Sequence, residues 1–135
     1  MNTKETTQIL AILKAAYPNS YKNMTPKEAS GTISVWASQF AEMPANIVLM
    51  AIQKHIGRNN FPPSVFEVKK GIQELHWEAY DILSDIETHD FAKNETYEQA
   101  KTIYEITKEY RMNIPDAPKL SQMLSNGKQY LLSEG

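Results

Sequence analysis

Hydrophobic residues recur along much of this chain at intervals of three and four, the spacing of one face of an α-helix. The longest such run begins after Pro62-Pro63, where a preceding helix cannot continue and where Ser64 and Glu67 form a capping box. We call its apolar stripe the seam. It has heptad spacing and consists of Val65, Val68, Ile72, Leu75, Ala79, Ile82 and Ile86. A stripe of this length needs a partner. The upstream residues supply one for the first turns, and nothing within the stretch supplies one for the later turns.

Three shorter helices are predicted before this one. The first begins at an Asn2 cap and ends before Pro18, and the second begins at a Thr25 cap. The third begins at Pro44 and is apolar on more than one face, so we expect it to be the most buried helix. Gly31 weakens the second helix and is expected to mark the close approach of another helix.

The rear half of the chain differs in charge. Residues 1–70 contain eight Lys and Arg against four Glu, whereas residues 71–135 contain six against twelve Asp and Glu. A further helix is predicted after Asn94, and a linker with two prolines at 113–118 precedes two small apolar clusters. Such clusters are typical of a docking peptide, and a C-terminal helix folded back on its own domain is the alternative.

No stretch alternates as a β-strand does, so the fold class is all-α. We predict a compact N-terminal helical bundle (1–75), followed by the rest of the long helix and an acidic, partly extended helical arm with a docking segment (76–135). The absence of cysteine excludes disulfides, thiolate metal sites and a cysteine nucleophile. No segment has the apolar length of a signal peptide core or a membrane span.

Motifs for catalysis are absent. The sequence has no phosphate-binding loop, no HExxH metal motif and no GxSxG nucleophile elbow, so we expect neither an enzyme nor a cofactor. Glu78, Asp81, Asp85 and His89 share one helical face, but a helix face alone offers few converging oxygens, so we expect a solvated face and no metal. His55 is expected to bond a local carbonyl group rather than to act as a ligand.

Four segments together resemble a known family: ILAILKAAYPN, the helix that contains ISVWASQF, MPANIVLMAIQKHI and NNFPPSVFEVKKGI. They are similar to the bacteriophage loader-and-inhibitor proteins of replicative helicases, found in phages of Gram-positive hosts. The resemblance covers residues from Ile9 to about Ile72. Its most specific part is the order of a His-Ile pair, a short polar loop, FPPS and a helix.

The resemblance implies an adaptor without catalysis that acts in the cytoplasm of the bacterial host. Family members bind a hexameric DnaB-type helicase in its nucleotide-bound form, suppress its ATPase and its loading on DNA, and pass it to an origin-bound initiator. The helicase is either phage or host encoded. Their N-terminal part is a small helical domain. Their C-terminal part is largely unstructured when free and carries the helicase contact.

On amphipathicity alone, we assign the helicase contact to apolar residues of the rear half: Tyr97, Tyr104, Tyr110, Leu120, Met123, Leu124, Tyr130 and Leu131. The first three could instead pack a coiled-coil pair. Two other functions stay open. One is a DNA-binding regulator of helix-turn-helix type, although its recognition helix would begin with an apolar run and direct nucleic-acid binding is not expected. The other is a structural dimer that self-associates through the seam from Val65 to Ile86.

Overall fold

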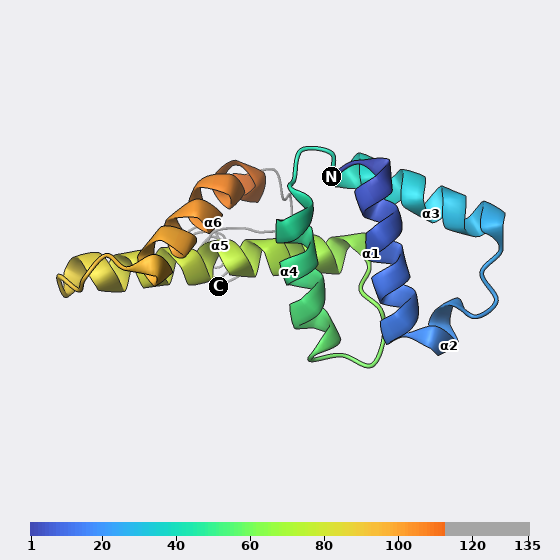
Figure 1. The fold of residues 1–135 in the computed structure, drawn as a ribbon, viewed down its shortest axis with the longest axis horizontal. Helices are drawn as coiled ribbons and strands as arrows, with labels where there is room; N and C mark the ends of the chain where they lie inside the picture. The colour runs from blue at the N-terminus through green and yellow to red at the C-terminus, as the bar shows by residue number, and fades with distance from the viewer. Residues whose placement is uncertain (113–135) are drawn as a thin grey trace, which may run out of the picture.

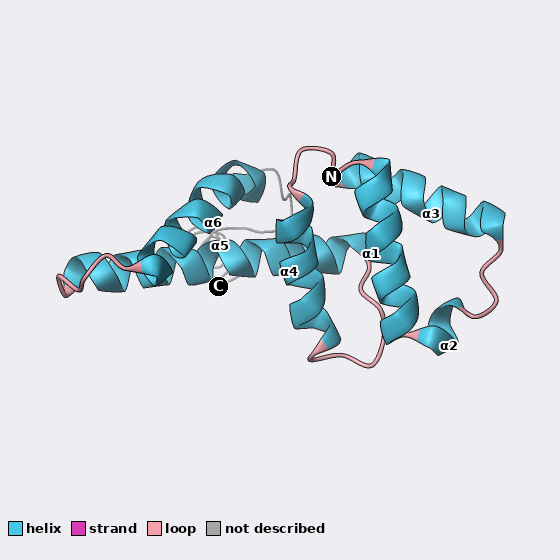
Figure 2. Ribbon diagram, in the orientation of Figure 1, coloured by secondary structure: helices cyan, strands magenta, loops and turns pink. Residues whose placement is uncertain are grey.

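A computed structural model describes residues 1–112, with side chains as far as Glu109. This part of the chain consists of helices joined by loops, without strands, which confirms the all-α class (Figure 1, Figure 2). None of its helices combines the length and the hydropathy that a membrane span requires. The helices are α1 (Thr3–Ala16), α2 (Pro18–Tyr21), α3 (Pro26–Gln39), α4 (Ala45–Ile56), α5 (Val65–Thr88) and α6 (Glu95–Met112).

The helix starts follow the capping signals of the sequence. The Asn2 side chain accepts a hydrogen bond from the Glu5 amide (2.8 Å), and the Glu5 carboxylate accepts one from the Asn2 amide (3.0 Å). Ser64 and Glu67 form the same reciprocal pair at the start of α5, with both distances 3.1 Å. Thr25 caps α3. Each such cap stabilises its helix by about 1 kcal/mol.

The main core lies where α1, α4 and the first turns of α5 meet. Helix α4 contributes four buried residues, as expected for the central helix. Phe40 and Met43, from the connection between α3 and α4, are also buried. The core cluster consists of Met1, Ile9, Leu13, Tyr17, Phe40, Met43, Ile47, Val48, Ala51, Ile52, Val68, Ile72 and Leu75.

The first residue joins α1 to the connection between α3 and α4. The amino group of Met1 donates hydrogen bonds to the backbone carbonyl oxygens of Phe40 (3.1 Å), Ala41 (3.3 Å) and Met43 (2.6 Å). Buried polar groups need such partners, and here the positive charge also faces the carbonyl groups that follow the C-terminal end of α3.

Helix α5 is continuous across residue 75 and extends away from the core (Figure 1). Helix α6 runs back antiparallel along its later turns, and the two form the most extensive helix pair in residues 1–112. The sequence left open what covers the later turns of the seam, and in the structure α6 of the same chain covers them. Sequence periodicity identified the face that needed cover but not the segment that covers it.

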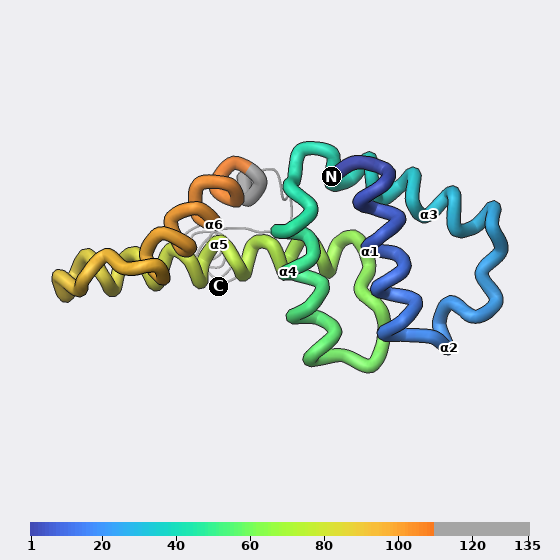
Figure 3. Tube along the Cα trace, in the orientation of Figure 1, coloured from blue at the N-terminus to red at the C-terminus, as the bar shows by residue number. Residues whose placement is uncertain are grey.

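The close approach of helices occurs at a different glycine from the one expected. Helix α4 crosses α5 (Figure 3). Ala51 faces Gly71 there, and a Cβ atom at Gly71 would lie 3.1 Å from the Ala51 Cβ atom. The expectation for Gly31 is wrong, because a Cβ atom there would meet nothing within 4 Å. Gly71 is needed for packing, and Gly31 is not.

The two glycines provide a matched pair of stability tests. We expect Gly71→Leu to lower the free energy of unfolding by about 1–3 kcal/mol, because the added side chain overpacks the α4–α5 crossing. We expect Gly31→Ala to raise it by about 0.5–1 kcal/mol, because alanine favours the helix and meets open space. Urea unfolding followed by circular dichroism measures both. Equal effects of the two substitutions would contradict this account of the crossing.

Candidate partner-binding surfaces

The chain reverses direction between α5 and α6 through a short, defined turn. After the cap residue His89, Asp90 adopts a left-handed conformation with φ of 52°, and the Phe91 amide donates to the Ile86 carbonyl oxygen at 3.0 Å, as in a Schellman motif. Aspartate is one of the few side chains that tolerates this conformation. The Asn94 side chain then accepts from the Tyr97 amide at 3.3 Å, which starts α6 beside the end of α5.

Two of the predicted helicase-binding residues pack inside this hairpin. Tyr97 is buried. Tyr104 is half-buried and stacks on the His76 ring, with ring centroids 4.9 Å apart. These contacts give both tyrosines a packing role within the chain, while their contact with a helicase stays a prediction. Tyr110 lies in α6, but its side chain is outside the described part. Leu120, Met123, Leu124, Tyr130 and Leu131 lie outside the described residues altogether.

A buried polar pair joins the two helices of the hairpin. The Thr107 hydroxyl donates its hydrogen to the Ile103 carbonyl oxygen (2.7 Å) and therefore accepts the hydrogen of His76 Nδ1 (3.0 Å). His76 is 3% exposed and Thr107 is fully buried. Sequence reasoning missed this pair. The available signals were a histidine next to a seam residue, and a threonine on the otherwise apolar and aromatic face of the next predicted helix.

Helix α5 also presents partly exposed aromatic side chains. Phe66, Trp77 and Tyr80 each leave more than a third of their surface exposed. Trp77 and Tyr80 are in edge-to-face contact, with ring centroids 5.7 Å apart. Exposed aromatic groups of this kind are enriched at protein interfaces.

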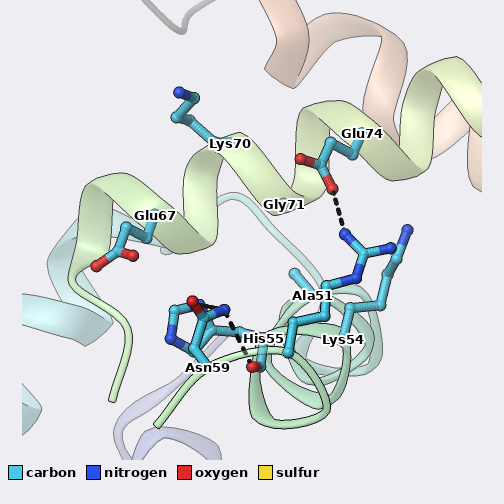
Figure 4. A pocket seen from close by; sticks show the side chains of 9 residues that line it. Ala51, Lys54, His55, Asn59, Glu67, Lys70, Gly71 and Glu74 are labelled. Atoms are coloured by element: carbon cyan, nitrogen blue, oxygen red, sulfur yellow. Dashed lines mark hydrogen bonds and ion pairs between the residues drawn. The ribbon is translucent and has the colours of Figure 1, made fainter. Parts of the chain in front are cut away.

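A cleft of about 220 Å³ lies between the C-terminal half of α4 and the first turns of α5 (Figure 4). Basic and acidic groups from the two helices line it, and Arg58, just after α4, pairs with Glu74 of α5 at 3.5 Å. As expected, His55 bonds a local carbonyl group, the Phe61 oxygen, at 2.8 Å. The cleft therefore offers paired charges for polar contacts. It is lined by Ala51, Lys54, His55, Arg58, Asn59, Glu67, Lys70, Gly71 and Glu74.

The loop beside this cleft is fixed to α1. The Tyr17 hydroxyl donates to the Asn59 carbonyl oxygen at 3.0 Å. Burial raises the pKa of Tyr17, and the negative charge of Glu67 raises it further. The hydroxyl therefore keeps its proton at neutral pH, and this bond holds the loop that leads into the start of α5.

A second hollow, which we call the α4–α6 groove, lies between the first turns of α4 and one face of α6. It has a volume of about 400 Å³, and its exposed lining is mostly apolar. Met50, Ile103 and Ile106 form its apolar part, and Glu95 and Glu98 are among its exposed residues. The remaining lining residues are Asn46, Ile47, Gln99 and Thr102.

The described residues support neither a metal site nor a DNA-binding helix-turn-helix. Within residues 1–109, no group of three or more His, Asp or Glu side chains is arranged to hold a metal ion. Glu78, from the acidic face of α5, forms an ion pair with Lys54. At the start of α4, Ile47 and Val48 are buried in the core. Helix α4 therefore cannot present these two residues to a DNA groove.

Comparison with known proteins finds one family. Residues 1–69 match the family model for the N-terminal domain of the helicase loader/inhibitor of phage SPP1. The match covers α1 to α4 and the first turn of α5, and it ends before the α5–α6 hairpin. No curated protein and no solved structure matches the chain.

The buried polar pair leads to a prediction about the hairpin. Thr107→Val keeps the side-chain shape but removes the buried hydroxyl that bonds His76 Nδ1, so we expect a loss of about 1–3 kcal/mol in the free energy of unfolding. Amide exchange should quicken most in α6. The control is Thr102→Val, because that exposed hydroxyl makes the same bond to the carbonyl four residues earlier, at 2.9 Å. Thr102→Val should change stability by no more than about 0.5 kcal/mol. An equal loss in both variants would argue against the His76 contact.

Proposed function

Since this chain belongs to the phage helicase loader/inhibitor family, we propose that it is an adaptor for a hexameric DnaB-type replicative helicase. It holds the ATPase of the helicase low until delivery and hands the ring to an initiator bound at the origin. It acts in the cytoplasm of the bacterial host and has no catalysis of its own. The observation that carries this proposal is the family match over residues 1–69.

The division of the chain supports an adaptor. Its front half contains the main core, against which Ile103 and Ile106 of α6 also pack. The family match ends at residue 69, in the first turns of the long helix and before that helix leaves the core. Beyond it, residues 71–135 carry twice as many acidic as basic side chains, and such a segment suits a basic protein surface better than a nucleic acid.

We place the helicase contact mainly in the C-terminal segment. Tyr97 and Tyr104 already pack against α5, so using them as contacts would require the hairpin to open. Leu120, Met123 and Leu124 lie outside the described residues. They stand at i, i+3 and i+4, the spacing of a helix that binds in a hydrophobic groove. Tyr110, Tyr130 and Leu131 complete the proposed contact.

The alternative functions are not favoured. A dimer through the seam would have to displace α6, because Leu75, Ala79 and Ile86 are buried within one chain. A helix-turn-helix would have to expose Ile47 and Val48 of α4, which are buried in the core. No observation on the described residues argues for either arrangement.

The proposal is tested by measuring binding of the full chain to the replicative helicase with a non-hydrolysable ATP analogue, together with helicase ATPase. We expect Leu124→Asp to weaken binding about tenfold or more and to restore ATPase, because burying a charge in an apolar interface costs more than about 1.4 kcal/mol. Ser125→Asp introduces the same charge at the next residue and should change affinity less than about twofold, since a charge that remains exposed to solvent costs little.

Two results would count against these assignments. Unchanged binding and inhibition after deletion of residues 113–135 would move the contact away from the C-terminal segment. Failure of the unaltered chain to bind the helicase, with or without nucleotide, would remove the proposed function itself.

A further inference from the structure

The α4–α6 groove is an apolar surface that residues 1–112 leave open. Met50, Ile103 and Ile106 are only partly buried, although they pack against the main core. The volume of about 400 Å³ lies within the range of sites that bind ligands or short peptide segments. The groove also lies on α6, the helix that leads directly into the rest of the chain.

We propose that the α4–α6 groove is the docking site for this chain's own C-terminal segment, residues 119–128, within one monomer. Leu120, Met123 and Leu124 occupy the apolar floor. The segment runs antiparallel to α6. This inference concerns the free protein, and it rests on the proposed function only where it bears on helicase binding.

The length of the chain permits this return. Ile106 lies six residues before the end of α6 at Met112, about 9 Å along the helix. The linker at 113–118 has six residues and spans at most about 20 Å. Leu120 can therefore reach Ile106 without any change in α6, whereas a much shorter linker could not.

The spacing of both partners matches in the antiparallel direction. From Ile106 back to Glu98 is eight residues, and from Leu120 forward to Lys128 is also eight. With Leu120 beside Ile106, an antiparallel segment would carry Lys128 toward Glu98 and Glu95. The charges are complementary there, because the α6 face contributes carboxylates and the segment contributes an ammonium group.

Docking in this groove makes the groove and the helicase compete for the same segment. Leu120, Met123 and Leu124 bind the groove in the free protein and bind the helicase in the complex. Helicase affinity is then lowered by the fraction of chains whose segment is undocked. This competition keeps the complex with the helicase reversible. A protein that hands its partner over needs a reversible complex.

Paramagnetic relaxation measures the docking directly, because the full chain has no cysteine and accepts a single spin label. A nitroxide at Gln122→Cys lies on the side of the segment that faces away from the groove. We expect it to broaden the amide signals of Met50, Ile103 and Ile106. Signals of Ile12 and Val35, exposed on α1 and α3, should stay sharp.

Two variants separate docking from folding. Thr102→Arg places a bulky cation in the groove and should abolish the broadening, whereas Thr96→Arg, near the start of α6 and outside the groove lining, should leave it intact. On the proposed function, Thr102→Arg should also tighten helicase binding about threefold or more, because the segment is no longer sequestered. The amide spectrum of each variant shows whether the rest of the chain keeps its fold.

The outcomes decide the proposal. Broadening spread evenly over the surface, or centred on another face, overturns it. So does broadening of isotope-labelled chains by spin-labelled chains in a mixed sample, since the groove would then hold a second copy. Localised broadening without any helicase binding would support the docking and refute the proposed function. Helicase binding without localised broadening would do the reverse.

Discussion

The structure depends on covering one long apolar stripe. Helix α5 has 24 residues and is about 36 Å long, which is more than the front core can cover. Val68, Ile72 and Leu75 close that core from one side, and the same face continues past it as Ala79 and Ile86. Exposed, this continuation would be an aggregation hazard. The fold of α6 back along α5 follows from this need.

Because α5 is one continuous helix, the front body and the hairpin share a rigid element. Ala51 faces Gly71 where α4 crosses the first half of α5, and Tyr104 stacks on His76 near the middle of α5. Less than two turns of helix separate Gly71 from His76. A partner that altered the hairpin would therefore act close to the crossing that holds α5 in the core, and the packing of each part limits how the other can move.

Local signals were predictable from the sequence, and partners were not. Caps at Asn2, Thr25 and Ser64 are set by residues three apart, so a short stretch contains all the information they need. The seam was also largely correct. Ile82 is the exception at 38% exposure, because it falls at the edge of the buried stripe, whereas His76 occupies the opposite edge and is buried. Which edge is covered depends on where α6 lies, and periodicity in α5 carries no information about that.

The lack of information about packing partners also explains why the sequence did not predict the roles of the two glycines and of the tyrosines in the candidate site. Gly31 and Gly71 both interrupt predicted helices, and only the position of α4 distinguishes the open one from the crowded one. Tyr97 and Tyr104 lie on an apolar face that any partner could cover, whether part of this chain or another protein. Amphipathicity predicts that such a face is buried but not by what. A polar residue on that face says more about its partner, because a buried hydroxyl such as that of Thr107 needs a hydrogen-bonding group beside it. His76 is that group.

Burial differs between the main core and the rear surfaces of the described chain, and this difference bears on function. Core residues such as Phe40, Val48 and Ile52 are fully buried, whereas the hairpin also uses half-buried aromatics and the α4–α6 groove remains open. Segments with fewer buried apolar contacts open at lower free energy than the core does. An adaptor must bind a ring-shaped helicase and then release it. Loosely packed surfaces at the rear of the chain and a well-packed core at its front suit this task. If the rear cover were as tightly packed as the core, a partner would have to supply most of the unfolding free energy before it could bind.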